Sequence, residues 1–271
     1  MKTRHLLTIA VLISAFFSAN AQRIDTIKVH SASMERDVDN IVVTPEQYND
    51  GYAFPVVYLL HGHGDDHTKW VGHTQPRLPQ LANQYGVIFV CPDGDTSWYF
   101  DSYINPKVRF ETYISQELVS YIDKHYKTIA NPGARAITGF SMGGHGALYL
   151  GIRHQDTFGS MGSLSGGVDF RPFPTKWGIA KRIGSKEEYP ENWEKNTVIN
   201  LTHLLKPGAM NIIFDCGTED FFYEVNCNLH DKLIKEGIPH DFYVRPGKHN
   251  WTYWLSSIRF QVMFFNDCFR K

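Results

Sequence analysis

The chain has 271 residues, of which 42% are hydrophobic and 20% are charged. This length and composition predict a globular protein with a sizeable hydrophobic core. The 27 basic and 28 acidic side chains give a formal net charge of −1. Proteins that bind nucleic acids or anionic membranes usually carry a basic excess. We therefore expect no nucleic-acid partner, and we look for function in a localised site.

The first 21 residues have the three parts of a secretory signal peptide. Lys2 and Arg4 give a basic start, residues 6–17 form an apolar run, and an Ala-Asn-Ala ending precedes Gln22. The apolar run is too short to span a membrane comfortably. No cysteine follows the cleavage point to carry a lipid. We predict cleavage after Ala21, no membrane span, and a secreted or periplasmic location.

Apolar and polar patterns predict alternating strands and helices. Polar and apolar residues alternate at 23–30 and 34–44, which predicts two antiparallel edge strands. Apolar runs predict further strands, mostly buried on both faces, at residues 54–60, 87–91, 134–138, 159–164, 211–217 and 241–245. Helices are predicted at residues 76–85, 110–126, 224–236 and 251–269, with another directly after residue 141.

Strands that alternate with helices predict an α/β fold with a mostly parallel sheet and helices on both faces. In such sheets, functional residues collect in loops at the carboxyl ends of the strands. The pattern breaks at residues 168–196, where prolines, tryptophans and mixed charges predict an inserted excursion that is a candidate lid. We expect residues 22–271 to form a single domain.

A Gly-x-Ser-x-Gly motif places Ser141 between the strand at 134–138 and the next helix. Strand, tight turn and helix are the context in which this motif indicates a nucleophile elbow. Such a turn strains the serine backbone, and glycines at positions 139 and 143 avoid Cβ clashes. The alternative is a small-residue turn into a packed helix.

A nucleophilic serine needs a base, and the base needs an orienting carboxylate. Doubly wound hydrolase sheets present these groups in the order Ser, acid, His. Asp220 follows the strand at 211–217 and His249 follows the last strand, so both fall where these groups are expected. The alternatives are that Asp220 caps a helix and that His249 is a plain surface residue.

Two other carboxylates compete with Asp220 for the acid position. Glu219 is its immediate neighbour, whereas Asp215 lies inside the predicted strand and is the weaker candidate.

The loop His61-Gly62-His63-Gly64 follows the strand at 54–60 and allows two interpretations. Residues 61–67 contain three histidines and two aspartates, which is a possible metal-ligand set. A glycine-rich loop at this place also exposes backbone N–H groups to an oxyanion. We favour an oxyanion hole formed by the backbone N–H groups of Met142 and of His63, or of its neighbour Gly62. We expect neither a metal nor a cofactor.

The chain has four cysteines, and export permits disulfides. Cys91 and Cys216 lie in apolar strand runs, where cysteine often acts as a small buried hydrophobe. Spacing does not decide the pairing, and Cys216–Cys227 is the first pair to check.

These motifs together resemble the putative-esterase family of α/β-hydrolases. Its members include tributyrin-type esterases, S-formylglutathione hydrolases, feruloyl and acetylxylan esterases, and mycobacterial mycolyltransferases. The matching segments are residues 58–64, 139–147, 216–221 and 249–254. Many relatives have Asp where this chain has Asn250.

The resemblance implies the α/β-hydrolase fold and a triad of Ser141, Asp220 and His249. It also implies that residues 93–99 border the substrate cleft. Trp98, Tyr99 and the excursion at residues 168–196 are candidates for stacking a sugar or an aromatic acyl group, with cleft walls or plain core packing as the alternative.

The sequence therefore predicts a secreted serine carboxylic-ester hydrolase that acts through an acyl-enzyme without a cofactor. We expect short-chain or carbohydrate-linked acyl esters, of acetyl or feruloyl type, as substrates, and the sequence does not indicate the oligomeric state. Export argues against the S-formylglutathione branch, whose substrate is cytosolic. Two alternatives remain: an acyltransferase that uses the same triad with a sugar acceptor, and a non-catalytic carbohydrate-binding protein.

Overall fold

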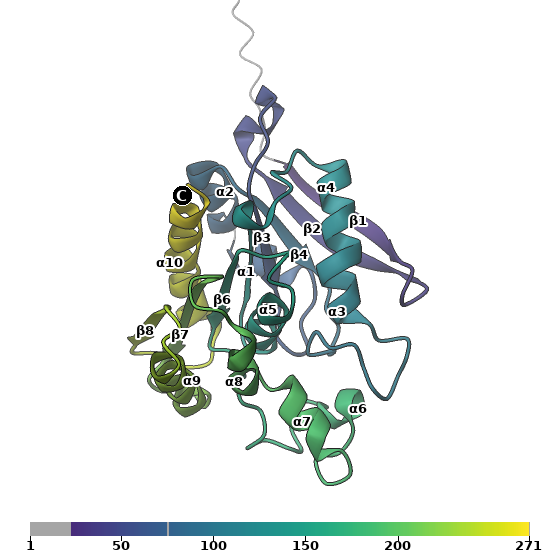
Figure 1. Cartoon of the computed structure of the whole chain (residues 1–271). Coiled ribbons are helices and arrows are strands. Elements are labelled where there is room, and N and C mark those ends of the chain that lie inside the picture. The colour runs from purple at the N-terminus through teal and green to yellow at the C-terminus, as the bar shows by residue number, and fades with distance from the viewer. Residues whose placement is uncertain (1–22, 75, 271) are drawn as a thin grey trace, which may run out of the picture.

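The computed structural model describes residues 23–74 and 76–270, which build one central sheet with helices on both faces (Figure 1). The predicted signal peptide, residues 1–21, lies outside the described residues. The strands are β1 (Arg23–Ser31), β2 (Arg36–Thr44), β3 (Val56–Leu60), β4 (Ile88–Pro92), β5 (Arg135–Gly139), β6 (Ser160–Leu164), β7 (Asn211–Gly217) and β8 (Asp241–Arg245).

The strands follow the order β1-β2-β4-β3-β5-β6-β7-β8 across the sheet. All pairs from β4 to β8 are parallel, whereas β1 pairs antiparallel with β2, and β2 pairs antiparallel with β4. The mostly parallel sheet with an antiparallel N-terminal side is as predicted. The expectation of two edge strands is wrong for β2, because its buried second half lies between β1 and β4.

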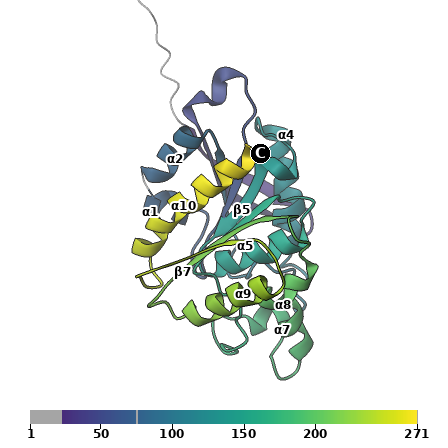
Figure 2. The same ribbon diagram turned by 60° about the vertical axis from the view of Figure 1, so that its left-hand side comes forward.

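Alternate side chains of the strands enter two separate cores. In β3, Val56, Tyr58 and Leu60 face one core, and Val57 and Leu59 face the other. The first core lies under α3 (Phe110–Thr112), α4 (Val119–His125), α5 (Met142–Arg153), α8 (Val198–Leu201) and α9 (Tyr223–Lys235). The second lies under α1 (Lys69–Thr74), α2 (Arg77–Tyr85) and α10 (Trp251–Phe269), which group on the opposite side of the sheet in Figure 2.

Most helices lie where the sequence predicted them. Helices α1 and α8 were not predicted, and the helix expected at 110–126 contains a π-helical segment, Tyr113–Leu118, between α3 and α4. Within residues 23–74 and 76–270, no helix has the length and apolar character needed to cross a bilayer. Cys216 and Cys227 are not joined by a disulfide.

The excursion at residues 168–196 packs against the body of the protein and contains α6 (Ala180–Ile183) and α7 (Pro190–Asn196). Phe170, Ile183 and Trp193 from this segment are fully buried. The carbonyl of Arg182 accepts hydrogen bonds from the Ser102 hydroxyl at 2.7 Å and the Tyr103 N–H at 2.9 Å. The excursion is therefore anchored to the loop that follows β4.

A buried polar network joins α10 to the centre of the sheet. Gln261 donates to the Asp215 carboxylate at 2.9 Å and to the Ser163 carbonyl at 2.9 Å, and it accepts from the Thr138 hydroxyl. Ser257 donates to the other Asp215 oxygen at 2.7 Å. Burial raises the pKa of Asp215, because a charged carboxylate is poorly solvated in the core. The hydrogen bonds from Ser257 and Gln261 oppose this shift by stabilising the charged carboxylate.

Replacing Gln261 with Ala should lower the free energy of unfolding by about 3 kcal/mol, because it leaves Asp215 and the Ser163 carbonyl with fewer partners in the core. Urea denaturation of the variant measures this loss. Arg259→Ala, at an exposed position on the same helix, is the matched control and should change the unfolding free energy by less than about 0.5 kcal/mol. Equal losses in both variants would contradict a special role for the network.

Candidate active site

Ser141 occupies the turn between β5 and α5 with a left-handed backbone, φ 57° and ψ −119°. This conformation is strained for a residue with a side chain. Close packing enforces it: a Cβ at Gly139 would lie 2.5 Å from the Leu60 carbonyl oxygen, and one at Gly143 only 2.3 Å from the same atom. The Ser141 N–H also donates to the Leu164 carbonyl at 3.0 Å. The hydroxyl is thus presented at the carboxyl edge of the sheet.

Two other loops bring a histidine and an aspartate to this hydroxyl. His249 Nε2 lies 2.9 Å from Ser141 Oγ, and His249 Nδ1 lies 2.8 Å and 3.0 Å from the two Asp220 carboxylate oxygens. The Asp220 side chain is fully buried and also accepts from the Phe222 N–H at 2.8 Å. An imidazole that donates from Nδ1 to a carboxylate has its Nε2 lone pair free to accept the serine proton. The arrangement can therefore activate Ser141 as a nucleophile.

The competing carboxylates lie elsewhere. Glu219 is exposed, and its carboxylate is 3.5 Å from Lys248 Nζ. Asp215 belongs to the buried α10 network described above. Of the three candidate acids, Asp220 is the one in contact with His249.

The loop after β3 is held against the start of α5. A Cβ at Gly143 would lie 2.7 Å from the His61 carbonyl oxygen, so the two backbones are in direct contact. The Tyr99 hydroxyl donates to that His61 carbonyl at 3.0 Å. The backbone N–H groups of Met142 and His63 belong to these two adjoining segments.

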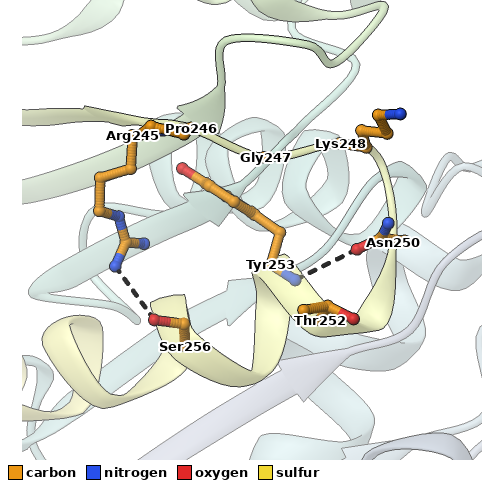
Figure 3. Close-up of a pocket in the computed structure, with 8 residues that line it drawn as sticks. All are labelled: Arg245, Pro246, Gly247, Lys248, Asn250, Thr252, Tyr253 and Ser256. Atoms are coloured by element: carbon orange, nitrogen blue, oxygen red, sulfur yellow. Dashed lines mark hydrogen bonds between the residues drawn. The ribbon is translucent and has the colours of Figure 1, made fainter.

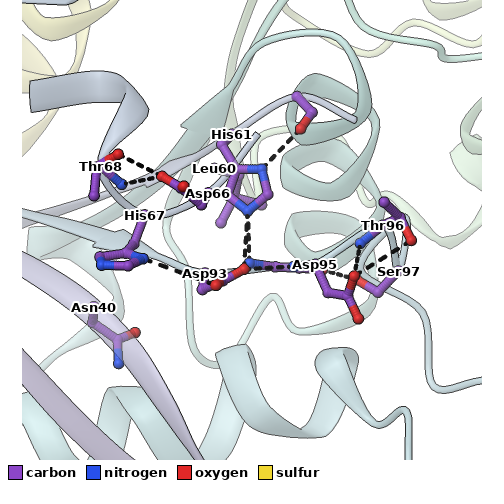
Figure 4. A network of polar contacts seen from close by, with 12 residues as sticks. Asn40, Leu60, His61, Asp66, His67, Thr68, Asp93, Asp95, Thr96 and Ser97 are labelled. Atoms are coloured by element: carbon purple, nitrogen blue, oxygen red, sulfur yellow. Dashed lines mark hydrogen bonds and ion pairs between the residues drawn. The ribbon is translucent and has the colours of Figure 1, made fainter. Parts of the chain in front are cut away.

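The His61 side chain fixes the same loop from within (Figure 4). Its Nδ1 donates to the Gly62 carbonyl at 2.8 Å, and its Nε2 accepts from the Gly94 N–H at 2.7 Å. These two bonds define a neutral Nδ1–H tautomer. Asp93 Oδ1, at 3.6 Å from the same Nε2, is then an electrostatic neighbour rather than a hydrogen-bond partner.

The three histidines of residues 61–67 do not meet at one point. His61 and His67 face the two oxygens of Asp93 at 3.6 Å and 3.8 Å, whereas His63 approaches the Trp177 carbonyl. Burial lowers the pKa of His63, and the Trp177 carbonyl opposes this shift only in part. Within the described part of the chain, no three His, Cys, Asp or Glu side chains form a group able to hold a metal ion.

Trp98 and Tyr99 lie beneath the site, with 1% and 0% of their surfaces exposed. The Tyr99 ring fills the space between Gly94 and Gly146, where an added Cβ would come within 2.4 Å and 2.3 Å of it. Trp98 Nε1 donates to the Trp177 carbonyl at 3.3 Å. Both side chains therefore support the loops around Ser141 from behind.

Two aromatic residues lie at the site itself: Phe221, which the sequence did not single out, and Trp177, which belongs to the excursion that was a stacking candidate. Phe221 directly follows Asp220 and is 51% exposed, with its ring centroid 4.2 Å from that of His249. Trp177 comes from the excursion and stacks on Phe221 at 5.8 Å and 21°. Adjacency to Asp220 was a usable signal for Phe221, whereas the irregular sequence around Trp177 gives no register from which to place its ring.

A cavity of about 400 Å³ lies behind the loop that carries His249 (Figure 3). Gly247, Lys248 and Asn250 line it, together with Arg245 and residues from the first turns of α10. Neither Ser141 nor His249 is part of its lining. The cavity therefore contacts the loop on the side away from the imidazole.

His145, four residues after Ser141 on α5, is fully buried among rings. Its neighbours within 5.6 Å, measured between ring centroids, are Trp98, Phe100, Tyr149 and Phe170. Neither ring nitrogen makes a hydrogen bond of good geometry to the described residues, and the Gly167 backbone is a weak polar neighbour of the ring. Burial lowers the pKa of His145 to about 3, and the Gly167 backbone opposes this only in part. The imidazole is thus neutral and joins the nucleophile helix to the excursion through packing.

Comparisons with known proteins show the family to which the chain belongs. The sequence model of the family described as "Putative esterase" matches residues 31–264. An acetyl esterase of Caldicellulosiruptor saccharolyticus is 24% identical over 223 residues, which cover 76% of this chain and 80% of that protein. A diacylglycerol acyltransferase/mycolyltransferase of Mycobacterium leprae is 25% identical over 277 residues, covering 88% of this chain and 82% of that protein.

The fold is shared with a solved structure of a ferulic acid esterase. The two superpose with a TM-score of 0.79 at 25% sequence identity, over 92% of this chain and 98% of that chain.

The buried His145 predicts a loss of stability in acid. In the unfolded chain this residue takes up a proton below the ordinary histidine pKa of about 6.5, whereas in the folded chain it does so only near pH 3. Between these two values the free energy of unfolding therefore falls by about 1.4 kcal/mol for each unit that the pH is lowered. Between pH 7.5 and pH 5, the wild type should therefore lose about 2 kcal/mol of unfolding free energy relative to His145→Leu.

Chemical denaturation of both proteins at the two pH values measures this difference. Phe170→Leu is the control, since it disturbs the same packing without removing a titrating group, and its cost should be the same at both pH values. A His145→Leu cost that does not change with pH would contradict a neutral buried imidazole.

Proposed function

The chain belongs to the putative-esterase family of α/β-hydrolases, and from this premise we propose that it is a secreted serine esterase that uses Ser141, His249 and Asp220. The observation that carries the proposal is the continuous hydrogen-bonded chain from Ser141 Oγ through both nitrogens of His249 to Asp220. A buried carboxylate, an oriented imidazole and a strained serine turn are costly to build, and together they serve acyl transfer.

In the first step Ser141 Oγ attacks the carbonyl carbon of the ester while His249 Nε2 takes its proton. Asp220 holds the Nδ1–H tautomer and stabilises the imidazolium that forms. The tetrahedral intermediate then collapses: the bond to the alcohol oxygen breaks, and His249 gives its proton to that oxygen. The alcohol leaves, and the acyl group stays on Ser141.

In the second step His249 takes a proton from water as the water oxygen attacks the acyl-enzyme. The second tetrahedral intermediate releases the carboxylic acid, and Ser141 recovers its proton from His249. Water supplies both the hydroxyl and the proton that the products gain, so the reaction balances without a cofactor.

We assign the oxyanion to the backbone N–H groups of Met142 and His63. Support comes from the direct contact between their two segments at Gly143 and from the clamp that Tyr99 and His61 place on the loop. Donors fixed in this way need no reorganisation when charge develops, and one such donor is worth about 3 kcal/mol of transition-state stabilisation.

The proposed substrates are short-chain or carbohydrate-linked acyl esters of acetyl or feruloyl type. The names of two relatives support this choice, since one is an acetyl esterase and one a ferulic acid esterase. The signal-peptide pattern of residues 1–21 supports export, where polysaccharide esters are accessible.

An acyltransferase is the second candidate, because a mycolyltransferase relative matches 88% of this chain. A sugar hydroxyl would then replace water in the second step on the same residues. Product analysis with sugar acceptors separates the two functions: transfer yields a new sugar ester, whereas hydrolysis yields only free acid.

Replacing Ser141 with Ala should lower kcat on p-nitrophenyl acetate by roughly 10⁴-fold or more, since no other group supplies the nucleophile. A fluorophosphonate probe should label the wild type and not the variant, and the thermal midpoint shows that the variant is folded. Near-full activity in Ser141→Ala would overturn the assignment, and a wild type that the probe fails to label would favour a non-catalytic carbohydrate-binding protein.

The acid is tested by a matched pair of isosteric changes. Asp220→Asn should reduce kcat roughly 10³- to 10⁴-fold, because the amide no longer holds the required His249 tautomer. Glu219→Gln removes the neighbouring, exposed carboxylate and should change kcat by less than about twofold. The opposite ranking in steady-state assays would identify Glu219 as the acid.

A further inference from the structure

Phe221 and Trp177 form a pair of accessible aromatic rings beside His249, set apart from the buried rings around them. Phe221 is half exposed, and Trp177 is partly buried. Phe222, the next residue, is buried and packs edge-to-face on His249 at 5.5 Å. The chain therefore places one buried and one exposed ring against the same imidazole.

The Trp177 ring is held in place from below. Its backbone is left-handed, with φ 52°, and its carbonyl accepts the Trp98 Nε1–H at 3.3 Å and faces the His63 ring. Phe173 and Phe222 contact the ring at 5.4 Å and 5.3 Å. A strained backbone that is fixed at several points is typical of a residue positioned for function.

The chemistry of the proposed reaction decides which half of the ester these rings meet. His249 Nε2 must give its proton to the departing alcohol oxygen, so that oxygen lies beside the imidazole. The acyl carbon is bonded to Ser141 Oγ and its chain leads away from His249. Phe221, with its ring centroid 4.2 Å from that of His249, borders the imidazole beside which the alcohol oxygen departs.

The surroundings of the rings favour an alcohol that carries hydroxyl groups. The exposed Glu219–Lys248 ion pair flanks Phe221 in sequence and links the two loops that carry Asp220 and His249. Asp95 and Arg182 lie near His63, whose ring faces the Trp177 carbonyl. An apolar ring face bordered by charged hydrogen-bonding groups suits the two faces of a sugar ring better than it suits a long aliphatic chain.

We infer that Phe221 and Trp177 form the subsite for the alcohol half of the ester, and that this subsite takes a sugar ring stacked on Phe221. The inference rests on the proposed function and names its substrate class. Phe221 is then a specificity-determining residue that distinguishes sugar esters from esters of small alcohols, while both give the same acyl-enzyme.

The test compares ethyl acetate with a monoacetylated methyl xyloside, which share the acetyl-enzyme and differ only in the alcohol. Phe221→Ala should lower kcat/KM for the xyloside ester about tenfold and for ethyl acetate less than about twofold. The rate of acetyl-enzyme hydrolysis should not change, because the alcohol has left by then. Phe221→Trp, which keeps a flat ring, should retain most of the activity on the xyloside ester.

Phe260→Ala removes an exposed ring on α10 and is the control, with no expected effect on either substrate. Activity on ethyl acetate shows that Phe221→Ala is folded and that the triad works, so loss of the proposed function would be seen separately. Equal losses on both substrates, no loss on either, or wild-type cleavage of ethyl acetate without cleavage of the xyloside ester would overturn the inference. A larger effect on ethyl butyrate than on the xyloside ester would place the acyl half on these rings and overturn it as well.

Discussion

The close contact between the backbone at the end of β3 and the start of α5 is the constraint on which the site depends. Gly143 approaches the Leu60 and His61 carbonyls so closely that no side chain fits between them. This contact forces Ser141 into its left-handed turn and sets the α5 N-terminus beside the loop that carries His63. One packing requirement thus places the nucleophile and both proposed oxyanion donors, and Tyr99 preserves it by bonding the His61 carbonyl.

The His249 imidazole is positioned by contacts that involve α10, on the other face of the sheet. His249 stands on a short loop between β8 and α10, and a cavity lies against that loop. The Gly247 carbonyl of the loop accepts from the Glu219 N–H at 2.9 Å, and the position of His249 also depends on where α10 begins. The buried network of Gln261, Asp215 and Ser257 ties that helix to the sheet, and Asn250 caps its first turn by accepting from the Tyr253 N–H at 3.2 Å. An Asn at this position thus performs a local structural role that does not need a charge.

Residues with a positive φ cluster in the loops around Ser141. Among the described residues, φ is positive at seven non-glycine residues, and all but Glu35 lie in the loops at this edge of the sheet or in the excursion above it. Each such residue costs of order 1–3 kcal/mol, which the surrounding packing must offset. The aromatic cluster around His145 provides such packing, because it joins α5, the loop after β4 and the excursion in one core.

The sequence was sufficient for the sheet, the order of its elements and the three loops that carry Ser141, Asp220 and His249, because strand periodicity and glycine turns are local signals. It did not separate supporting aromatics from accessible ones. Trp98 and Tyr99 attracted attention by their position after β4, yet they are buried, while Trp177 and Phe221 reach the surface of the site. Which face of a ring meets solvent is decided by contacts between loops distant in sequence, and composition and spacing carry no information about those contacts.

The buried and the exposed aromatic rings differ in how easily they can be replaced, and this difference affects how substrate specificity can change. Trp98 and Tyr99 hold the loops, and replacing either would disturb the His61 carbonyl or the Trp177 carbonyl to which they bond. Phe221 can be replaced without touching those bonds, because its ring takes part only in packing contacts with His249, Trp177 and Phe222. The residues that hold the loops are therefore distinct from those that we propose to meet the alcohol. Such a separation permits related proteins to share one mechanism and to differ in substrate. The ring beside Asp220 can vary while the hydrogen bonds that join Asp220, His249 and Ser141 stay intact.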